Sequence, residues 1–355
     1  MIKVLLAEDS PVMQQFLIHA ISSDPEIEIV GVANNGEEAV AAVKNYHPDV
    51  IAMDWQMPKL DGLQATRIIM ETMPTPIVIV TGLVSAKDAA FSFRMMEAGA
   101  LAVISKPHSA VHPEYMNDVK KLNQTLKLMS EIKLVKRFSH TSTTSVVVQP
   151  GIENSHRSGS DIRLVAIGAS TGGPIVLQKI FSELPEHLPV PLLIVQHISP
   201  GFVGGFVEWL QMTTKFPLHL AAHGDLLLPG HGYIAPDDFQ MGVGSGLRIV
   251  LSNDGMENGL RPSVAHLFHS VAINIGAGAV GILLTGMGKD GAEELKLMKE
   301  KGAITIAQDK RSSIIHGMPG EAIKINAALY ILSPEEISGM LVSLLKKVDL
   351  VGVSL

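Results

Sequence analysis

The feature that most restricts how this chain folds is the alternation of short, mainly apolar runs with segments of helical periodicity. Up to about residue 108 the apolar runs are Val4–Ala7, Ile27–Val32, Val50–Met53, Ile77–Val80 and Ala102–Ile104. Apolar runs of this length suit buried strands, and those without a polar residue suit strands that are buried on both faces. Their alternation with amphipathic segments is typical of a parallel sheet covered by helices on both sides.

The same alternation returns in the second half of the chain, with apolar runs at Leu164–Ile167, Pro191–Val195 and Ala279–Leu284. Between the halves, Pro113–Phe138 has apolar residues at a spacing that predicts an amphipathic helix. Polar stretches without periodicity follow at 139–145 and 154–160 and indicate a linker. We therefore expect an α/β protein with two doubly wound parallel-sheet domains, divided into residues 1–110, a linker with an amphipathic helix at 111–160, and residues 161–350.

Composition excludes several classes of protein. The net charge of −7 argues against nucleic acid as a partner, and the absence of cysteine excludes a disulfide framework and thiol catalysis. Glu8 and Asp9 interrupt the first apolar run too early for a signal peptide or an inserted membrane segment. These observations predict a cytoplasmic protein without direct membrane insertion.

Acidic residues follow two strands of the first predicted sheet. Glu8 and Asp9 come after the first strand, and Asp54 comes after the third. Ligands of open parallel sheets lie beyond the carboxyl ends of the strands, so these three carboxylates are expected to share one crevice. Mg²⁺ would relieve their repulsion, and it would place a phosphoryl donor beside Asp54. Each acid taken alone also suits a helix N-cap.

Two further strands end in residues that can bind a phosphoryl group, because Thr81 offers a hydroxyl and Lys106 offers an ammonium. The set resembles the response-regulator receiver domain in Glu8-Asp9, Met53-Asp54-Trp55-Gln56-Met57-Pro58 with Asp61-Gly62, Val80-Thr81-Gly82 and Ser105-Lys106-Pro107. The resemblance implies a flavodoxin-like fold, Asp54 as phosphoacceptor and a histidine kinase as phosphodonor. It also implies Mg²⁺ bound through Glu8, Asp9, Asp54 and Gln56, with Thr81 and Lys106 as the phosphorylation switch. Val103 departs from the aromatic residue that such domains often carry.

In the second domain, the apolar strand Leu164–Ile167 runs into Gly168-Ala169-Ser170-Thr171-Gly172-Gly173-Pro174. This matches the Gly-x-Ser-x-Gly nucleophile elbow, in which small neighbours allow a tight strand-to-helix turn to present a serine hydroxyl. A phosphate-binding glycine turn is the alternative interpretation.

A serine nucleophile needs a base and an orienting group. His197 directly follows the apolar strand at Pro191–Val195 and Gln196, and therefore lies at the same sheet edge as Ser170. Asp290 follows the third apolar strand and could orient the imidazole, although a helix cap is an alternative role for it. The order Ser, His, Asp differs from that of the α/β-hydrolases, so their fold is not supported.

The second domain resembles the chemotaxis protein-glutamate methylesterase family. The motifs are Gly168 to Gly173, Gln196-His197, Leu284 to Ala292, Ala307-Gln308-Asp309 and Gly317-Met318-Pro319. The resemblance implies a Rossmann-like domain with catalytic Ser170, His197 and Asp290, in which Thr171 and Met287 line the oxyanion site and no cofactor is required.

The reaction implied by the resemblance is phosphorylation-activated hydrolysis of glutamyl methyl esters on chemoreceptor cytoplasmic helices during chemotaxis adaptation, with deamidation of receptor glutamines as an additional activity. Docking of the unphosphorylated receiver over the Ser170 edge is the expected mode of control.

Alternative functions differ from this prediction in identifiable features. A dinucleotide site would need a glycine where Ser170 stands. A DNA-binding response regulator would need a basic recognition helix, which residues 161–355 lack. A non-catalytic signalling scaffold would not need the serine, histidine and aspartate together.

Overall fold

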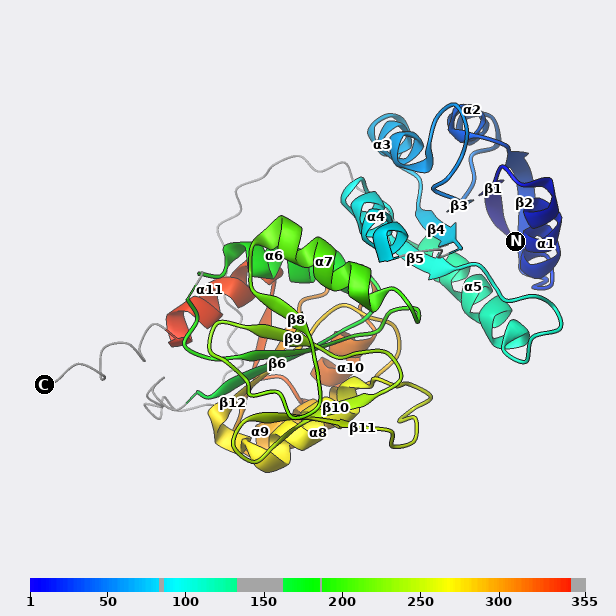
Figure 1. Ribbon diagram of the computed structural model, residues 1–355. Helices are drawn as coiled ribbons and strands as arrows, with labels where there is room; N and C mark the ends of the chain where they lie inside the picture. Colours follow the sequence, from blue (N-terminus) through cyan, green and yellow to red (C-terminus); the bar gives the residue numbers. More distant parts are fainter. Residues whose placement is uncertain (83–85, 133–161, 186, 346–355) are drawn as a thin grey trace, which may run out of the picture. The chain divides into compact units, whose positions relative to one another are not determined.

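A computed structural model describes residues 1–82, 86–132, 162–185 and 187–345, with the backbone alone at 86–91. The chain divides into two compact units, Met1–Ser142 and Thr143–Leu355, and each is described by itself (Figure 1). Both are α/β units built on sheets whose strands pair in parallel. The fold class expected from the sequence is therefore confirmed. The predicted linker stretches at 139–145 and 154–160 lie outside the described residues.

The first unit is a five-stranded sheet in the order β2-β1-β3-β4-β5, which is the flavodoxin-like arrangement. Its strands are β1 (Ile2–Ala7), β2 (Ile27–Ala33), β3 (Val50–Met53), β4 (Ile77–Thr81) and β5 (Ala102–Ser105). Its helices are α1 (Pro11–Ile21), α2 (Gly36–Tyr46), α3 (Gly62–Thr72), α4 (Ala86–Glu97) and α5 (Tyr115–Ser130). Helices α1 and α5 pack together, while α3 packs against both α2 and α4.

Local sequence explains where these elements begin. The central strands β3 and β4 are buried along their whole length, and three helices start at side-chain caps. The cap oxygens of Ser10, Asn35 and Asp61 accept hydrogen bonds from backbone N–H groups in the first turns of α1, α2 and α3. Each helix therefore starts close to the carboxyl end of a strand, which is the edge that carries the predicted site.

Helix α5 is shorter than the predicted segment Pro113–Phe138, and residues beyond 132 are not described. It packs on β1, β3, β4 and β5, with Val119, Leu122, Leu126 and Met129 buried. The amphipathic helix thus completes the cover of the first sheet. The proposed boundaries at 110 and 160 remain a prediction.

The second unit is a seven-stranded sheet in the order β14-β13-β12-β6-β7-β9-β8. Its strands are β6 (Leu164–Ala169), β7 (Leu192–Gln196), β8 (Leu218–Leu220), β9 (Gly232–Ile234), β12 (Ala279–Leu283), β13 (Ile304–Gln308) and β14 (Tyr330–Leu332). A separate antiparallel ribbon consists of β10 (Gln240–Gly244) and β11 (Arg248–Ser252). The helices are α6 (Gly173–Glu183), α7 (Val203–Thr214), α8 (Val264–Asn274), α9 (Ala292–Glu300), α10 (Met318–Lys324) and α11 (Pro334–Leu345).

The helices of this unit form two groups. Helix α6 packs with α7 and α11, while α9 packs with α8 and α10 (Figure 1). Strands β6, β7 and β12 are buried along their whole length, and they lie side by side at the centre of the sheet. Their carboxyl ends therefore meet at one edge, and this is where the predicted nucleophile, base and orienting group follow the strands.

Candidate functional site

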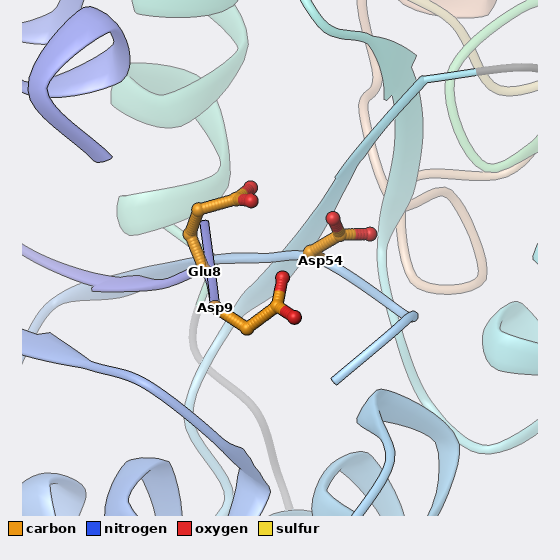
Figure 2. Close-up of side chains that lie close together, drawn as sticks. All are labelled: Glu8, Asp9 and Asp54. Carbon is orange, nitrogen blue, oxygen red and sulfur yellow. The ribbon is translucent and has the colours of Figure 1, made fainter. Parts of the chain in front are cut away.

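In the first unit, the three predicted acidic residues come together (Figure 2). One carboxylate oxygen from each of Glu8, Asp9 and Asp54 lies within 4.8 Å of the others. Glu8 and Asp54 are buried, whereas Asp9 is exposed. Three carboxylate oxygens at this spacing suit a hard divalent cation, because oxygen donors and negative charge are what such a cation requires.

Lys106 is the cation that faces these acids. Its Nζ lies 2.6 Å from Oδ2 of Asp54 and 2.7 Å from Oε2 of Glu8. Burial raises the pKa of Glu8 despite the hydrogen bond from Lys106. Burial also acts to lower the pKa of Lys106, but the hydrogen bonds and charges of Asp54 and Glu8 outweigh it, so this pKa is raised. The ammonium therefore stays charged and partly neutralises a site rich in negative charge.

The other predicted residues of this site lie at the same edge of the sheet. Thr81 ends β4, is buried, and accepts a backbone hydrogen bond from Lys106 through its carbonyl oxygen. Gln56 is exposed, and its backbone N–H donates to Oδ1 of Asp54 at 3.2 Å. The ion pair between Lys106 and Glu8 was not predicted from the sequence.

In the second unit, Ser170 and His197 follow neighbouring strands at matched positions. Ala169 and Gln196 are register partners of β6 and β7, so the serine and the histidine are the next residue on each strand. The backbone N–H of His197 donates to the carbonyl of Ala169 at 2.9 Å, and that of Ser170 donates to the carbonyl of Thr285 at 3.0 Å. The elbow is therefore anchored to the strands on both of its sides.

Asp290 reaches the imidazole from the loop after β12. Its Oδ2 lies 3.0 Å from Nε2 of His197, and the side chains are only 4% and 12% exposed. The buried Nε2 is not aligned for a hydrogen bond within the described chain. No hydrogen bond joins Oγ of Ser170 to a described residue in this structure, and such contacts often tighten only when substrate binds.

The same carboxylate also caps helix α8. Oδ2 of Asp290 accepts a hydrogen bond from the N–H of Val264 at 2.7 Å, and Oδ1 accepts one from Ala265 at 3.3 Å. The side chain of Asp290 therefore caps a helix and also lies beside the imidazole of His197, while its role as the orienting group stays a prediction. The cap joins residues distant in sequence, and the sequence pattern alone did not reveal which helix it serves.

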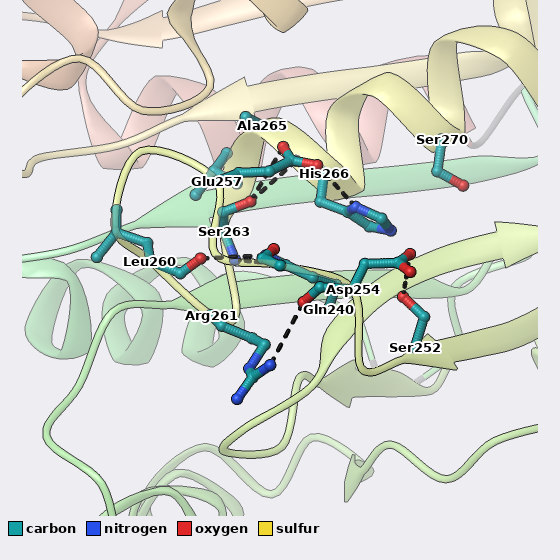
Figure 3. A network of polar contacts seen from close by, with 12 residues as sticks. Gln240, Ser252, Asp254, Glu257, Leu260, Arg261, Ser263, Ala265, His266 and Ser270 are labelled. Atoms are coloured by element: carbon teal, nitrogen blue, oxygen red, sulfur yellow. Dashed lines mark hydrogen bonds and ion pairs between the residues drawn. The ribbon is translucent and has the colours of Figure 1, made fainter.

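A polar network supports the start of α8 (Figure 3). Oε1 of Gln240, from β10, accepts the N–H of Ser263 at 2.9 Å, while its Nε2 donates to the carbonyl of Leu260 at 3.1 Å. Oε1 of Glu257 lies 2.9 Å from Nδ1 of His266. The network ties the segment before α8 to the β10–β11 ribbon. It thereby holds in place the backbone N–H groups that donate hydrogen bonds to Asp290.

Thr171 and Met287 lie at the rim of this region, where Thr171 is half-buried and Met287 is exposed. Gly286 passes so close to the loop that carries Ser170 that a Cβ at Gly286 would lie 2.6 Å from the Cβ of Ser170. Three buried polar residues here were not singled out from the sequence as functional: Gln196, Thr285 and Gln308. Their hydrogen bonds to backbone groups are the signal that identifies them, and it is visible only in three dimensions.

Comparison with known families divides the chain in the same way. Residues 4–112 match the response regulator receiver domain family, and residues 165–341 match the CheB methylesterase family. No helix in the described ranges is both long and apolar enough to cross a membrane.

Individual relatives match nearly the whole chain. A protein-glutamate methylesterase/protein-glutamine glutaminase of Nitrosospira multiformis is 50% identical over 97% of this chain and 97% of its own length. One from Geobacter metallireducens is 48% identical over 97% and 99%, respectively. The crystal structure of the Thermotoga maritima CheB methylesterase catalytic domain is 34% identical, covers 52% of this chain and 98% of that chain, and has a TM-score of 0.50.

Proposed function

The chain belongs to the family of receiver-coupled protein-glutamate methylesterases, and from that premise we propose which of its residues perform the reaction and which control it. It is a protein-glutamate methylesterase/protein-glutamine glutaminase of chemotaxis adaptation, regulated by its receiver domain. One observation carries the assignment of residues: Ser170 and His197 follow register-paired strands, and the Asp290 carboxylate lies 3.0 Å from the imidazole.

In the proposed mechanism, Oγ of Ser170 attacks the carbonyl carbon of a glutamyl methyl ester. His197 takes the serine proton and returns it to the departing methanol, and water then hydrolyses the acyl-enzyme by the reverse proton path. A glutamine amide passes through a similar tetrahedral anion, which accounts for glutaminase activity at the same site. No cofactor is needed for either reaction.

We propose different roles for the two nitrogens of the His197 imidazole. Nε2 of His197 faces Asp290 at 3.0 Å, which leaves Nδ1 as the atom that accepts the serine proton. A negative carboxylate beside Nε2 favours the tautomer that carries its proton there, and it stabilises the imidazolium that forms during attack. Thr171 and Met287 are proposed to line the space in which the ester carbonyl binds.

The receiver residues fit a divalent cation, and we assign Mg²⁺ to Glu8, Asp9 and Asp54, with Gln56 as a further ligand. When bound, Mg²⁺ neutralises carboxylate and phosphoryl charge during phosphoryl transfer. Asp54 is the proposed phosphoacceptor, since its carboxylate lies at the shared edge. Lys106 already contacts Asp54, and Thr81 ends the next strand, so both can bind phosphoryl oxygens.

For control, the unphosphorylated receiver is proposed to block access of a bulky helical substrate to Ser170, and phosphorylation of Asp54 shifts that equilibrium toward the open form. The substrate is the set of methylated glutamates on the cytoplasmic helices of a chemoreceptor, and a histidine kinase is the phosphodonor. The protein therefore works in the cytoplasm, without inserting into the membrane and without nucleic acid.

The test is release of methanol from methyl-labelled receptor membranes by the full chain, with and without acetyl phosphate. We expect Ser170→Ala to abolish release under both conditions, and Asp54→Asn to abolish only the stimulation by acetyl phosphate. Residual release by Ser170→Ala at the wild-type rate would refute the assignment of the nucleophile. Stimulation that persists in Asp54→Asn would refute the proposed control.

A further inference from the structure

The loop that presents Ser170 is a tight turn whose central peptide can take two orientations. The N–H of Gly173 donates to the carbonyl of Ser170 at 2.8 Å, and Gly172 has φ 81° and ψ −10°. These values describe a type II turn, which differs from type I mainly by a flip of the central peptide. Glycine is permitted in both forms, so the orientation of the Thr171–Gly172 peptide must be determined by its neighbours.

The first carbonyl of the turn is held by Gln196. Nε2 of this residue, which is 4% exposed, donates to the carbonyl of Ser170 at 2.9 Å and to that of His197 at 2.8 Å. A single amide group thus joins the residue that carries the nucleophile to the residue that carries the base. Gly173 is required next to it, because a Cβ there would overlap with Oε1 of Gln196.

The second carbonyl of the turn is held by Thr285, which is fully buried two residues after the end of β12. Its Oγ1 lies 3.0 Å from the carbonyl of Thr171 and 3.1 Å from that of Ile315. A hydroxyl has one hydrogen, and the Ile315 carbonyl already accepts the N–H of Gly286 at 2.9 Å. The Thr171 carbonyl has no other donor among the described residues, so it is the acceptor that needs the hydroxyl.

The hydrogen bonds to the carbonyls of Ser170 and Thr171 also determine where the N–H groups of the same two peptides point, which is away from Gln196 and Thr285. In a trans peptide the N–H points opposite to the C=O, so the fixed Ser170 carbonyl directs the N–H of Thr171, and the fixed Thr171 carbonyl directs that of Gly172. Neither N–H donates to an acceptor within the described part of the chain. In a nucleophile elbow, the N–H of the residue after the nucleophile binds the developing oxyanion.

We infer that Thr285 and Gln196 are positioning residues of the esterase: they fix two peptide planes so that the N–H groups of Thr171 and Gly172 face the reacting carbonyl. The inference rests on the proposed function of Ser170. Neither side chain touches the substrate. Thr285 removes the alternative orientation of the Thr171–Gly172 peptide, and Gln196 holds the Ser170–Thr171 peptide before it, so that neither N–H group turns away from the site.

Thr285→Val tests this in the full chain activated with acetyl phosphate, because valine keeps the shape and removes the hydroxyl. Thr305→Val is the matched control. Thr305 is equally buried and donates to the carbonyl of Ala327 at 2.8 Å, but it belongs to the neighbouring strand β13 and not to the elbow. Both variants lose a buried hydroxyl, so both are expected to unfold at a lower temperature.

We expect Thr285→Val to lower kcat for methanol release by about 10²-fold, as loss of one oxyanion donor does, with KM unchanged. Thr305→Val should keep the wild-type kcat, and Thr285→Ser should recover most of the lost rate because it restores the hydroxyl. If Thr285→Val is unfolded in the thermal melt, Gln196→Met carries the same expectation for the Ser170 carbonyl. A kcat for Thr285→Val equal to that of Thr305→Val, or no recovery in Thr285→Ser, overturns the inference.

A second readout separates this inference from the proposed function. A fluorophosphonate labels Ser170 without any receptor: Oγ attacks the phosphorus, negative charge develops on the phosphoryl oxygen, and fluoride leaves. Because the oxyanion donors would stabilise that charge, Thr285→Val should slow the labelling relative to Thr305→Val. If the wild type labels but releases no methanol from receptor, the proposed substrate is wrong while the labelling ratio still decides the positioning role. Equal labelling rates of the two variants overturn the positioning role alone, and no labelling of the wild type overturns both.

Discussion

Replacement of Asp290 by asparagine separates the two roles of this carboxylate. Oδ2 accepts a hydrogen bond from the N–H of Val264 at 2.7 Å and lies 3.0 Å from Nε2 of His197, whereas Oδ1 accepts only the longer bond from Ala265 at 3.3 Å. We therefore expect the asparagine oxygen to occupy the Oδ2 position and its NH₂ group to replace Oδ1. The cap and the histidine tautomer survive, and the negative charge is lost.

The lost charge determines the expected size of the effect. Opposite charges 3.0 Å apart attract by roughly 5.5 kcal/mol at an effective dielectric constant of 20, which is an upper limit for stabilisation of the imidazolium. Since about 1.4 kcal/mol corresponds to tenfold in rate, kcat should fall by between about 10² and 10⁴. Unfolding free energy should fall by only about 1 kcal/mol, the usual contribution of a charge at a helix N-terminus.

The assay is methanol release from methylated receptor with acetyl phosphate present, together with urea denaturation. The matched control is Ser263→Ala, because Oγ of Ser263 caps the same helix by accepting the N–H of His266 at 3.1 Å and does not contact His197. It should cost about 1 kcal/mol of stability and little activity. If Asp290→Asn retains as much kcat as Ser263→Ala, then Asp290 is only a cap and the reasoning fails.

Three further predictions follow from the described residues. Burial lowers the pKa of His316 below 6.5, so protonation favours the unfolded chain and the free energy of unfolding falls as pH drops through 6.5. His316→Gln should therefore shrink the difference between the urea midpoints at pH 8 and pH 5.5, and an unchanged difference would contradict this role of His316. Gly173→Ala should cost about 1–3 kcal/mol of stability through overpacking and most of the kcat. Its control is Gly339→Ala on α11, where a Cβ meets open space and should stabilise the protein slightly; equal effects of the two variants would contradict the close approach of Gly173 to Gln196. Mg²⁺ at 100 times its Kd should stabilise the receiver by about 2.7 kcal/mol, which calorimetry would measure as a rise in the unfolding midpoint. Asp9→Asn should remove this rise, and an undiminished rise in the variant would place the ion elsewhere.

The central strands were predictable from sequence because they are buried on both faces. The apolar runs that predicted β3, β4, β6, β7 and β12 each coincide with a strand of the structure. The residues that follow these strands were predictable for the same reason, since parallel strands bring their carboxyl ends to one edge.

Short or mixed segments were not predictable in this way. Strands β8, β9 and β14 have three residues each, too few for a period to be recognised, and the ribbon β10–β11 contains glycine and polar residues. Their place in the fold depends on tertiary contacts and not on local pattern.

The buried polar contacts of the site also lay beyond sequence reasoning. The bond from Thr285 to the carbonyl of Thr171 and the cap by Asp290 of α8 join segments far apart in the chain. A threonine or an aspartate after a strand has many possible partners, and spacing along the sequence does not choose among them. Only the arrangement of β6 beside β12 makes these particular partners available.

The position of β12 between β6 and β13 determines when activity can arise during synthesis. The strands that precede Ser170 and His197 are translated before β12, which comes from the last third of the chain and must insert beside β6. A nascent chain that ends before residue 279 carries the serine with neither the hydroxyl of Thr285 nor the carboxylate of Asp290. With Asp290 in its proposed role, esterase activity is therefore acquired only after residue 290 has been translated, and shorter copies of the enzyme are expected to be inactive.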